Sequence, residues 1–218
     1  MSAREEILAR LRAATADVPT GPGARGEVPT IAATSASDVE TLDLFVDHVA
    51  DYRATVIRCS PDQVGAEVAA ALARGRAHTV LVPDGLDASW VAAAQTAGLT
   101  LRRDAGADGE RLSADELDGV DAVVTAARVG IATTGTIVLD HTPDQGRRAL
   151  TLVPDQHVCV IRADQVVHDV PDAVALLEPS RPLTWISGPS ATSDIELDRV
   201  EGVHGPRTLD VVVVDPRG

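Results

Sequence analysis

The chain has 218 residues, of which 44% are hydrophobic and only 2% aromatic, so aliphatic side chains must form the core of one sizeable domain. Its formal net charge of −14 opposes binding to nucleic acid or an anionic membrane, because phosphate groups would meet a repulsive field. We expect no membrane insertion and a cytoplasmic location, since no apolar run approaches the roughly 20 residues that span a bilayer and the first residues are charged rather than a signal peptide.

Cysteine, histidine and lysine usage limits the chemistry further. Cys59 and Cys159 each occur in an apolar strand-like run, so we expect buried reduced thiols rather than a disulfide framework or an iron–sulfur cluster in this chain. None of the six histidines shows the paired spacing of a metal site, and no metal is predicted. The sequence contains no lysine, which excludes a P-loop lysine, a Schiff-base lysine and a Ser–Lys dyad.

The first predicted element is a short helix near the N-terminus. Ser2 is a suitable N-cap, and Ile7, Leu8 and Leu11 share one face at helical spacing. The stretch 18–37 that follows is rich in Pro, Gly, Thr and Ser, a composition that does not bury enough apolar surface for regular structure.

We therefore divide the chain into an N-terminal helix with a Pro/Gly-rich arm, residues 1–36, and an α/β domain, residues 37–218. Within the arm, Gly21, Gly23 and Gly26 satisfy the G-x-G-x-x-G pattern of dinucleotide-binding loops. That pattern requires a preceding strand and a following helix, whereas here prolines surround the glycines and a helix precedes them. We interpret the segment as a loop.

The α/β domain begins with alternating helices and strands and continues with strands joined by short turns. In chain order we expect a helix over 37–52, a strand 54–59, a helix 61–73, a strand 78–82, a helix 87–97, strands 99–102, 121–126, 131–140, 149–153 and 157–161, a helix 170–177, and strands 183–187 and 209–214. Ser60 is expected as an N-cap and Pro61 as the first residue of its helix. The pattern predicts an open, largely parallel sheet flanked by helices, with a hairpin or mixed-sheet segment after residue 127.

Three segments place glycines, hydroxyls and ionisable groups just beyond predicted strands, where open α/β sheets bind ligands. The first block is residues 129–136, VGIATTGT. Glycines allow close backbone approach and hydroxyls bind a phosphate or carboxylate, so its candidate ligand-binding residues are Gly130, Thr133, Thr134, Gly135 and Thr136. A tight turn entering a buried strand explains the same residues equally well.

The second block is residues 152–157, LVPDQH. Asp155 and His157 flank a strand start and could orient one another for proton transfer, which makes His157 a candidate catalytic residue. A histidine that is hydrogen-bonded for structural reasons is the alternative interpretation.

The third block comprises residues 186–196, ISGPSATSDIE, and residues 202–207, GVHGPR. Its ionisable groups nominate Asp194 and His204 as catalytic residues. The other candidates are expected to bind a small anionic substrate, and they are Gly188, Ser190, Glu196, Gly205 and Arg207. Helix capping and salt bridges around the last strand are the structural alternative.

The motifs G-I-A-x-T-G-T-I-V-L, L-x-P-D-x-H, I-S-G-P-S-x-T-x-D-I-E and G-V-H-G-P-R resemble, in order and spacing, the signature blocks of the LutC/YkgG family of lactate-utilisation proteins, which contain a LUD domain. The resemblance implies a NagB/RpiA/CoA-transferase-like fold and participation in oxidising L-lactate to pyruvate. It also implies LutA-like and LutB-like partner proteins that carry the iron–sulfur clusters, with no cofactor in this chain. Many relatives have an acidic residue at the position of Thr133, so a carboxylate mechanism there is not available to this chain.

Two other functions stay open at this point. A stand-alone NagB/RpiA-like enzyme or binding protein would take a phosphorylated, CoA-linked or folate-like ligand, with Arg128, Arg147, Arg148 and Arg207 contacting the anion. A non-catalytic assembly or regulatory module is the third hypothesis. The sequence does not decide whether the chain itself catalyses a step.

The third block generates a first test. Replacing Asp194 or His204 by Ala should abolish lactate-dependent activity while the circular dichroism spectrum stays that of the folded protein, because both side chains are proposed to act on the ligand rather than in the core. Full activity and ligand binding in both variants would show that this block is not the site.

Overall fold

The structure is a computed structural model that describes residues 3–14, 16, 38–104, 111–192, 200–201 and 205–217, without side chains for 191–192 and 200–201. The chain divides into two compact units, residues 1–32 and 33–218. The first contains helix α1 (Ala3–Ala14), in which Ile7 and Leu11 are exposed. Ser2, the predicted linker and its three glycines lie outside the described residues.

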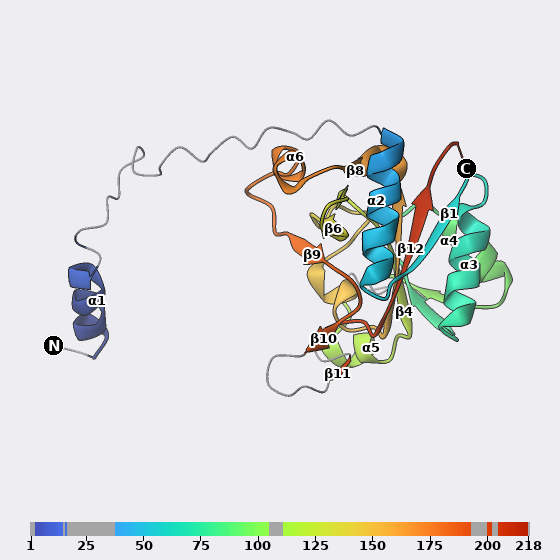
Figure 1. The fold of residues 1–218 in the computed structure, drawn as a ribbon. Coiled ribbons are helices and arrows are strands. Elements are labelled where there is room, and N and C mark those ends of the chain that lie inside the picture. The colour runs from blue at the N-terminus through green and yellow to red at the C-terminus, as the bar shows by residue number, and fades with distance from the viewer. Residues whose placement is uncertain are drawn as a thin grey trace. The chain divides into compact units, whose positions relative to one another are not determined.

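A six-stranded parallel sheet forms the centre of the second unit (Figure 1). Its strands, in spatial order, are β1 (Thr55–Cys59), β12 (Thr208–Val214), β7 (Gln156–Arg162), β4 (Ala122–Ala126), β2 (Thr79–Leu81) and β3 (Thr100–Arg102). Almost every residue of β4, β7 and β12 is buried, because helices or a second sheet cover both faces of a parallel sheet.

The two faces of the sheet are covered by different elements. Helices α3 (Val64–Arg74) and α4 (Ser89–Thr96) pack on one face around the alternate residues of the strands, such as Val158 and Val212. Helices α2 (Asp38–Asp51) and α5 (Ala114–Asp118) and the 3-10 helix η1 (Arg148–Thr151) belong to clusters on the other face. Helical layers on both sides of the sheet confirm the predicted fold class.

A second, smaller sheet lies on the α2 side and follows the order β8 (Val166–Val167), β5 (Val129–Ile131), β6 (Thr136–Leu139) and β9 (Thr184–Ile186). Strands β5 and β6 form an antiparallel hairpin, and β9 is antiparallel to β6. This confirms the predicted hairpin or mixed-sheet segment after residue 127. The remaining elements are η2 (Ala163–Gln165), α6 (Val170–Ala175) and the antiparallel pair β10 (Ala191–Thr192) and β11 (Val200–Glu201).

Three local predictions are wrong. The helix predicted over 61–73 begins only at Val64. Ser60 does not cap it, because the Ser60 hydroxyl binds Asp62 and Gln63 in a turn before the helix. The single strand predicted over 131–140 is broken by a turn at residues 132–135. The apolar run 149–153 forms η1 rather than a strand, because its buried Leu150 packs against α5 and the sheet instead of pairing with a strand.

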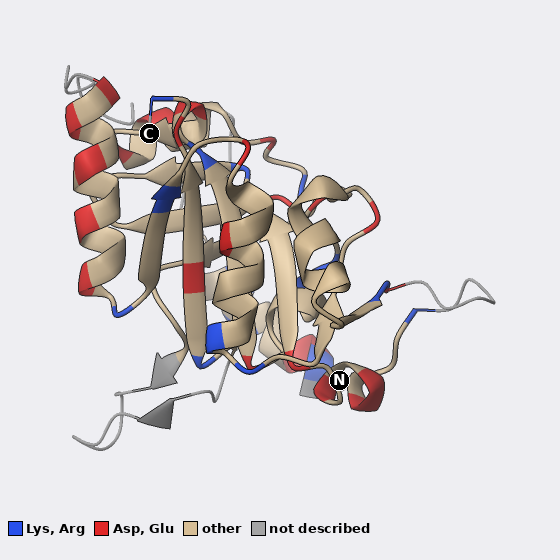
Figure 2. Ribbon diagram, turned by 90° about the vertical axis from the view of Figure 1, so that its right-hand side faces the viewer, with Lys and Arg blue, Asp and Glu red and all other residues tan. Residues whose placement is uncertain are grey.

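Charge is distributed unevenly over this unit. Figure 2 shows acidic residues recurring along the outer side of α2, while β12 carries one acidic residue, Asp210, inside the sheet. Asp210 is buried and pairs with Arg74 Nη2 at 3.0 Å and with Gln156 Nε2 at 2.7 Å. Within the described ranges, no helix has the length and apolar character needed to cross a membrane.

The β5–β6 turn depends on a glycine. Gly135 has φ +55°, and an added Cβ would lie 2.7 Å from the C and O atoms of His48 in α2. Gly135→Ala should therefore lower the free energy of unfolding by roughly 2–4 kcal/mol, from left-handed backbone strain and overpacking together.

Gly98→Ala is the matched control for urea unfolding. Gly98 also has positive φ, +92°, but no atom lies within 4 Å of an added Cβ. We expect only the conformational cost there, about 1–2 kcal/mol. Equal losses in the two variants would show that contact with α2 does not constrain the hairpin.

Candidate functional site

A cavity of about 320 Å³ opens at the amino ends of β7 and β12, beside the end of β9. His157 and Leu209 line it from the two central strands, and residues 184–190 and 205–206 line it from the third block and its approach. The sequence predicts ligand-binding residues just beyond the ends of strands. The third block does follow β9, but the cavity that it lines lies at the amino edge of the central sheet and not at the carboxyl edge.

His157 is the most buried ionisable residue of this cavity, with 1% of its surface exposed. Burial disfavours the charged ring and lowers the pKa of His157 to about 4. The ring is therefore neutral near pH 7, where it exchanges hydrogen bonds with a ligand but does not supply a positive charge.

A short polar chain inside the sheet holds the His157 ring. His157 Nε2 lies 2.8 Å from the Thr125 hydroxyl, which donates weakly to Cys159 Sγ at 3.9 Å. The direction of the bond between His157 and Thr125 depends on which ring nitrogen carries the proton. All three side chains are buried, so each hydrogen bond offsets a desolvation cost.

The third block folds against the turn that follows α2 and against the start of β12. Gly188 has φ +82°, and an added Cβ would lie 2.6 Å from Tyr52 Cβ, so only glycine fits this approach to the turn. Ser190 N donates to Pro206 O at 2.8 Å, which joins the two halves of the block. Gly188, Ser190 and Gly205 all line the cavity.

The first block reaches the cavity only through hydroxyl groups. Thr134 Oγ1 donates to Thr136 Oγ1 at 2.8 Å, and Thr136 Oγ1 lies 2.8 Å from Ser187 Oγ, which lines the cavity. Thr133 instead donates to Asp169 Oδ1 at 3.2 Å. The block therefore supports the cavity wall rather than forming it.

Two glycines of the first block serve packing. A Cβ on Gly130 would lie 2.9 Å from side-chain atoms of both Ile161 and Phe45 in the core. Gly135 is held against α2 as described above. These positions fit the turn interpretation of the block better than direct ligand contact.

Other candidates lie elsewhere. Arg207 lines a neighbouring cavity of about 490 Å³ and lies 3.6 Å from Asp155, with both side chains well exposed. Asp194, Glu196 and His204 lie outside the described residues. The structure therefore brings His157, Gly188, Ser190 and Gly205 together.

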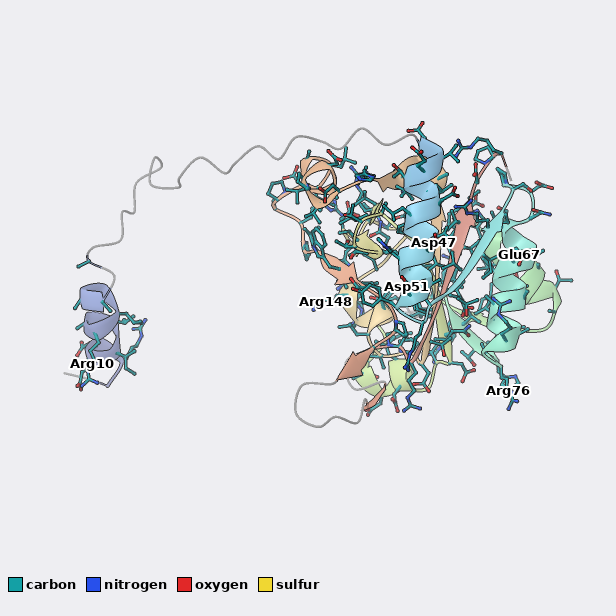
Figure 3. The ribbon with its side chains drawn as sticks, viewed as in Figure 1. Arg10, Asp47, Asp51, Glu67, Arg76 and Arg148 are labelled. Atoms are coloured by element: carbon teal, nitrogen blue, oxygen red, sulfur yellow. The ribbon has the colours of Figure 1, made fainter. Side chains whose placement is uncertain are left out.

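Arg148 is the cationic residue that the described lining contributes, and Figure 3 shows it near β9. Trp185, exposed in β9, adds an aromatic face, and Thr151, Thr184 and Ser187 add hydroxyls. The sequence suggests Arg148 only as an anion contact of a NagB/RpiA-like enzyme or binding protein, and it does not nominate Trp185, Thr184 or Ser187. Thr151 was missed because 149–153 was interpreted as a strand. A rare tryptophan in an aromatic-poor chain was the available signal for Trp185.

The two cysteines are buried in different strands, β1 and β7. Burial raises the pKa of Cys59, and it raises the pKa of Cys159 to about 12. Both are therefore protonated thiols with little reactivity near pH 7. Among the described side chains, no three His, Cys, Asp or Glu residues are grouped as a metal site would require.

The fold and the cavity define an α/β domain with a small, largely polar cavity at the edge of its sheet. Hydroxyls, a neutral imidazole and one guanidinium converge there, and no carboxylate occurs in the described part of the lining. That composition favours a small anionic ligand with further hydrogen-bonding groups.

Comparison with known proteins agrees with this class. The family model described as LUD domain matches residues 42–214. The chain is 50% identical over 182 residues to a protein of Deinococcus radiodurans named "Lactate utilization protein C", covering 82% of this chain and 81% of that one. A protein of the same name from Bacillus licheniformis is 32% identical over 103 residues, which cover 43% of this chain and 42% of the relative.

A solved structure is similar as well. The crystal structure of a DUF162 family protein from Deinococcus radiodurans has a TM-score of 0.68 and 43% sequence identity, covering 83% of this chain and 99% of that chain. The chain belongs to the LUD domain family, which confirms the resemblance carried by the three blocks.

Burial of His157 predicts a specific pH dependence of stability. Above pH 6.5 the ring is neutral in both the folded and unfolded chain. Between pH 6.5 and about 4 only the unfolded chain takes up this proton, so stability falls as the pH falls, by about 3 kcal/mol over the whole window.

His157→Gln should remove most of that loss, because Gln cannot titrate and can still reach Thr125. Urea unfolding between pH 4.5 and 7.5 measures it, with exposed His78→Gln as the matched control. If the two variants show the same pH dependence as the parent protein, His157 is not buried in neutral form.

Proposed function

We propose that this chain acts as a lactate-utilisation protein C and takes part in oxidising L-lactate to pyruvate, with the cavity at the amino ends of β7 and β12 binding the 2-hydroxy acid. The main support is the 50% identity over four-fifths of the chain to a relative that carries this name. The chemical character of the described cavity lining supports it independently.

The lining offers a partner for each group of a 2-hydroxy acid. Arg148 would bind the carboxylate, for which a planar guanidinium provides two parallel donors. His157 Nδ1 and the hydroxyls of Ser187 and Thr184 would bind the hydroxyl group. A His157 pKa of about 4 makes the ring a weak base, so its proposed role is to orient the hydroxyl and accept its hydrogen bond.

Lactate oxidation releases two electrons and two protons, and we assign their acceptors to partner proteins. Cys59 and Cys159 are buried, separate and protonated, which makes them poor electron carriers or metal ligands. We therefore propose that iron–sulfur clusters reside on LutA-like and LutB-like partners. Reduced, buried thiols also fit our proposal that the protein works in the cytoplasm.

The proposal that this cavity binds the carboxylate of lactate depends on Arg148. Arg148→Gln should weaken binding of L-lactate and pyruvate at least about 10-fold in calorimetric titrations, since a hydrogen bond to a charged group contributes roughly 1.5–3 kcal/mol. Arg76→Gln is the charge-matched control, because Arg76 is exposed at the end of α3 (Figure 3) and lines the neighbouring cavity. Unchanged affinity in Arg148→Gln would show that lactate does not bind in this cavity.

A complementation experiment separates a substrate-binding role from an assembly role. Cells that lack the chain should regain lactate oxidation with the parent protein but not with Arg148→Gln, while both proteins co-purify equally with iron–sulfur partners. Full restoration by Arg148→Gln would favour the assembly or regulatory module.

A further inference from the structure

Another cavity, of about 410 Å³, lies at the edge of the central sheet opposite the proposed lactate site. Its residues come from segments that follow β2, β4, β6 and β7, including Gly85, Arg128, Gln145 and Arg162. In parallel sheets this carboxyl edge is the usual ligand position. The proposed lactate site lies at the amino edge and does not use it.

The chain changes direction at this cavity. After β2 it crosses to α4 on one face of the sheet, whereas after the neighbouring strand β4 it enters the β5–β6 hairpin on the other face. Connections that leave adjacent strands in opposite directions open a crevice between their carboxyl ends. Gly85 N donates to Pro143 O at 2.9 Å and closes the base of this crevice.

Gln145 supplies a hydrogen-bond donor to the crevice. Only 1% of its surface is exposed, and its Oε1 accepts from the backbone N–H groups of Asp140 and His141 at 2.8 and 3.0 Å. These two bonds fix which amide atom is oxygen, so Nε2 is turned the other way. Within the described chain Nε2 has no recorded hydrogen-bond partner and is not one of the fully buried polar atoms, so both of its N–H groups are available to a ligand in the cavity that Gln145 lines.

Two guanidinium groups also line the cavity. Arg128 donates through Nη2 to Leu176 O at 2.9 Å and lies 3.8 Å from Asp140, and Arg162 donates through Nε to Asp164 at 2.9 Å. Each recorded partner occupies only part of a five-donor fork, which leaves N–H groups for a ligand.

One carboxylate, Asp144, limits the charge of the ligand. Its Oδ1 is buried without a partner in the described chain, so that oxygen is turned into the protein. Two arginines and one aspartate give the described lining a formal charge of about +1, and Asp140 and Asp164 beside the arginines reduce the positive field further, which favours a singly charged anion over a polyphosphate.

We propose that this cavity is a second ligand site and that it binds a small oxyanion, a carboxylate or a singly charged phosphate group, through Gln145 Nε2, Arg128 and Arg162. The ligand accepts from the Gln145 amide donor, and the two guanidinium groups hold its oxygens from the rim. This site is separate from the proposed lactate site and does not depend on it.

The test uses the full chain, with inorganic phosphate near pH 6 and acetate as probes. Binding is followed by the ¹⁵N signal of the Gln145 side-chain amide. Gln145→Glu keeps an oxygen for the two backbone amides but replaces the Nε2 donor with a carboxylate oxygen, so we expect at least a 10-fold loss of affinity measured by calorimetry. If only phosphate saturates the change in the Gln145 signal, the natural ligand carries a phosphate group. If acetate saturates it, the natural ligand carries a carboxylate.

Arg162→Gln changes an exposed side chain and leaves the core intact, and it should weaken the same binding several-fold. It therefore provides a second test if Gln145→Glu does not fold. Arg58→Gln is the charge-matched control in the edge strand β1, and Arg148→Gln should leave the Gln145 signal responsive. The proposal is overturned if neither probe shifts that signal, or if Arg162→Gln and a folded Gln145→Glu bind like the parent protein.

Discussion

The parallel pairing of β12 between β1 and β7 is the interaction on which the rest of the molecule depends. The last strand of the chain fills the position between an early strand and a late one, with register from Thr208 opposite Gln156 to Val214 opposite Arg162. Its alternate residues serve both hydrophobic clusters, one against α3 and one against α2. Because the third block enters β12, the same pairing brings Gly205 beside His157.

Close backbone approach to α2 is the second constraint. Gly135 and Gly188 both have positive φ, and they approach the carboxyl half of α2 and Tyr52 just after it so closely that a side chain would overlap them. Two segments far apart in sequence are thereby held against one helix, and the Thr136 to Ser187 hydrogen bond joins them. The polar wall of the cavity is thus built on packing that only glycines permit.

The loop over residues 140–147 lines the second cavity and contacts a wall residue of the first, although the two cavities open at opposite edges of the sheet. His141, at φ +57°, bonds Thr184 Oγ1 in the first cavity through Nε2 at 2.9 Å, while its backbone N–H bonds Gln145 Oε1 in the second. A non-glycine residue in this backbone conformation carries strain of about 1–2 kcal/mol, which these hydrogen bonds offset.

The sequence by itself determined the parallel α/β sheet, most of its helices and strands, the later mixed segment and the family, because hydrophobic periodicity and contiguous motifs are local properties. It did not reveal α5 or the short strand β8. It did not determine that Arg148–Thr151 forms a 3-10 helix where a strand over 149–153 was predicted, since a short apolar run is compatible with either structure and burial of Leu150 decides between them. Nor could it show that Thr133 turns to Asp169 or that Arg207 faces another cavity. Only the tertiary structure decided that His157 is neutral and that Arg148 and Trp185 join it, because burial and proximity arise from contacts between residues distant in sequence.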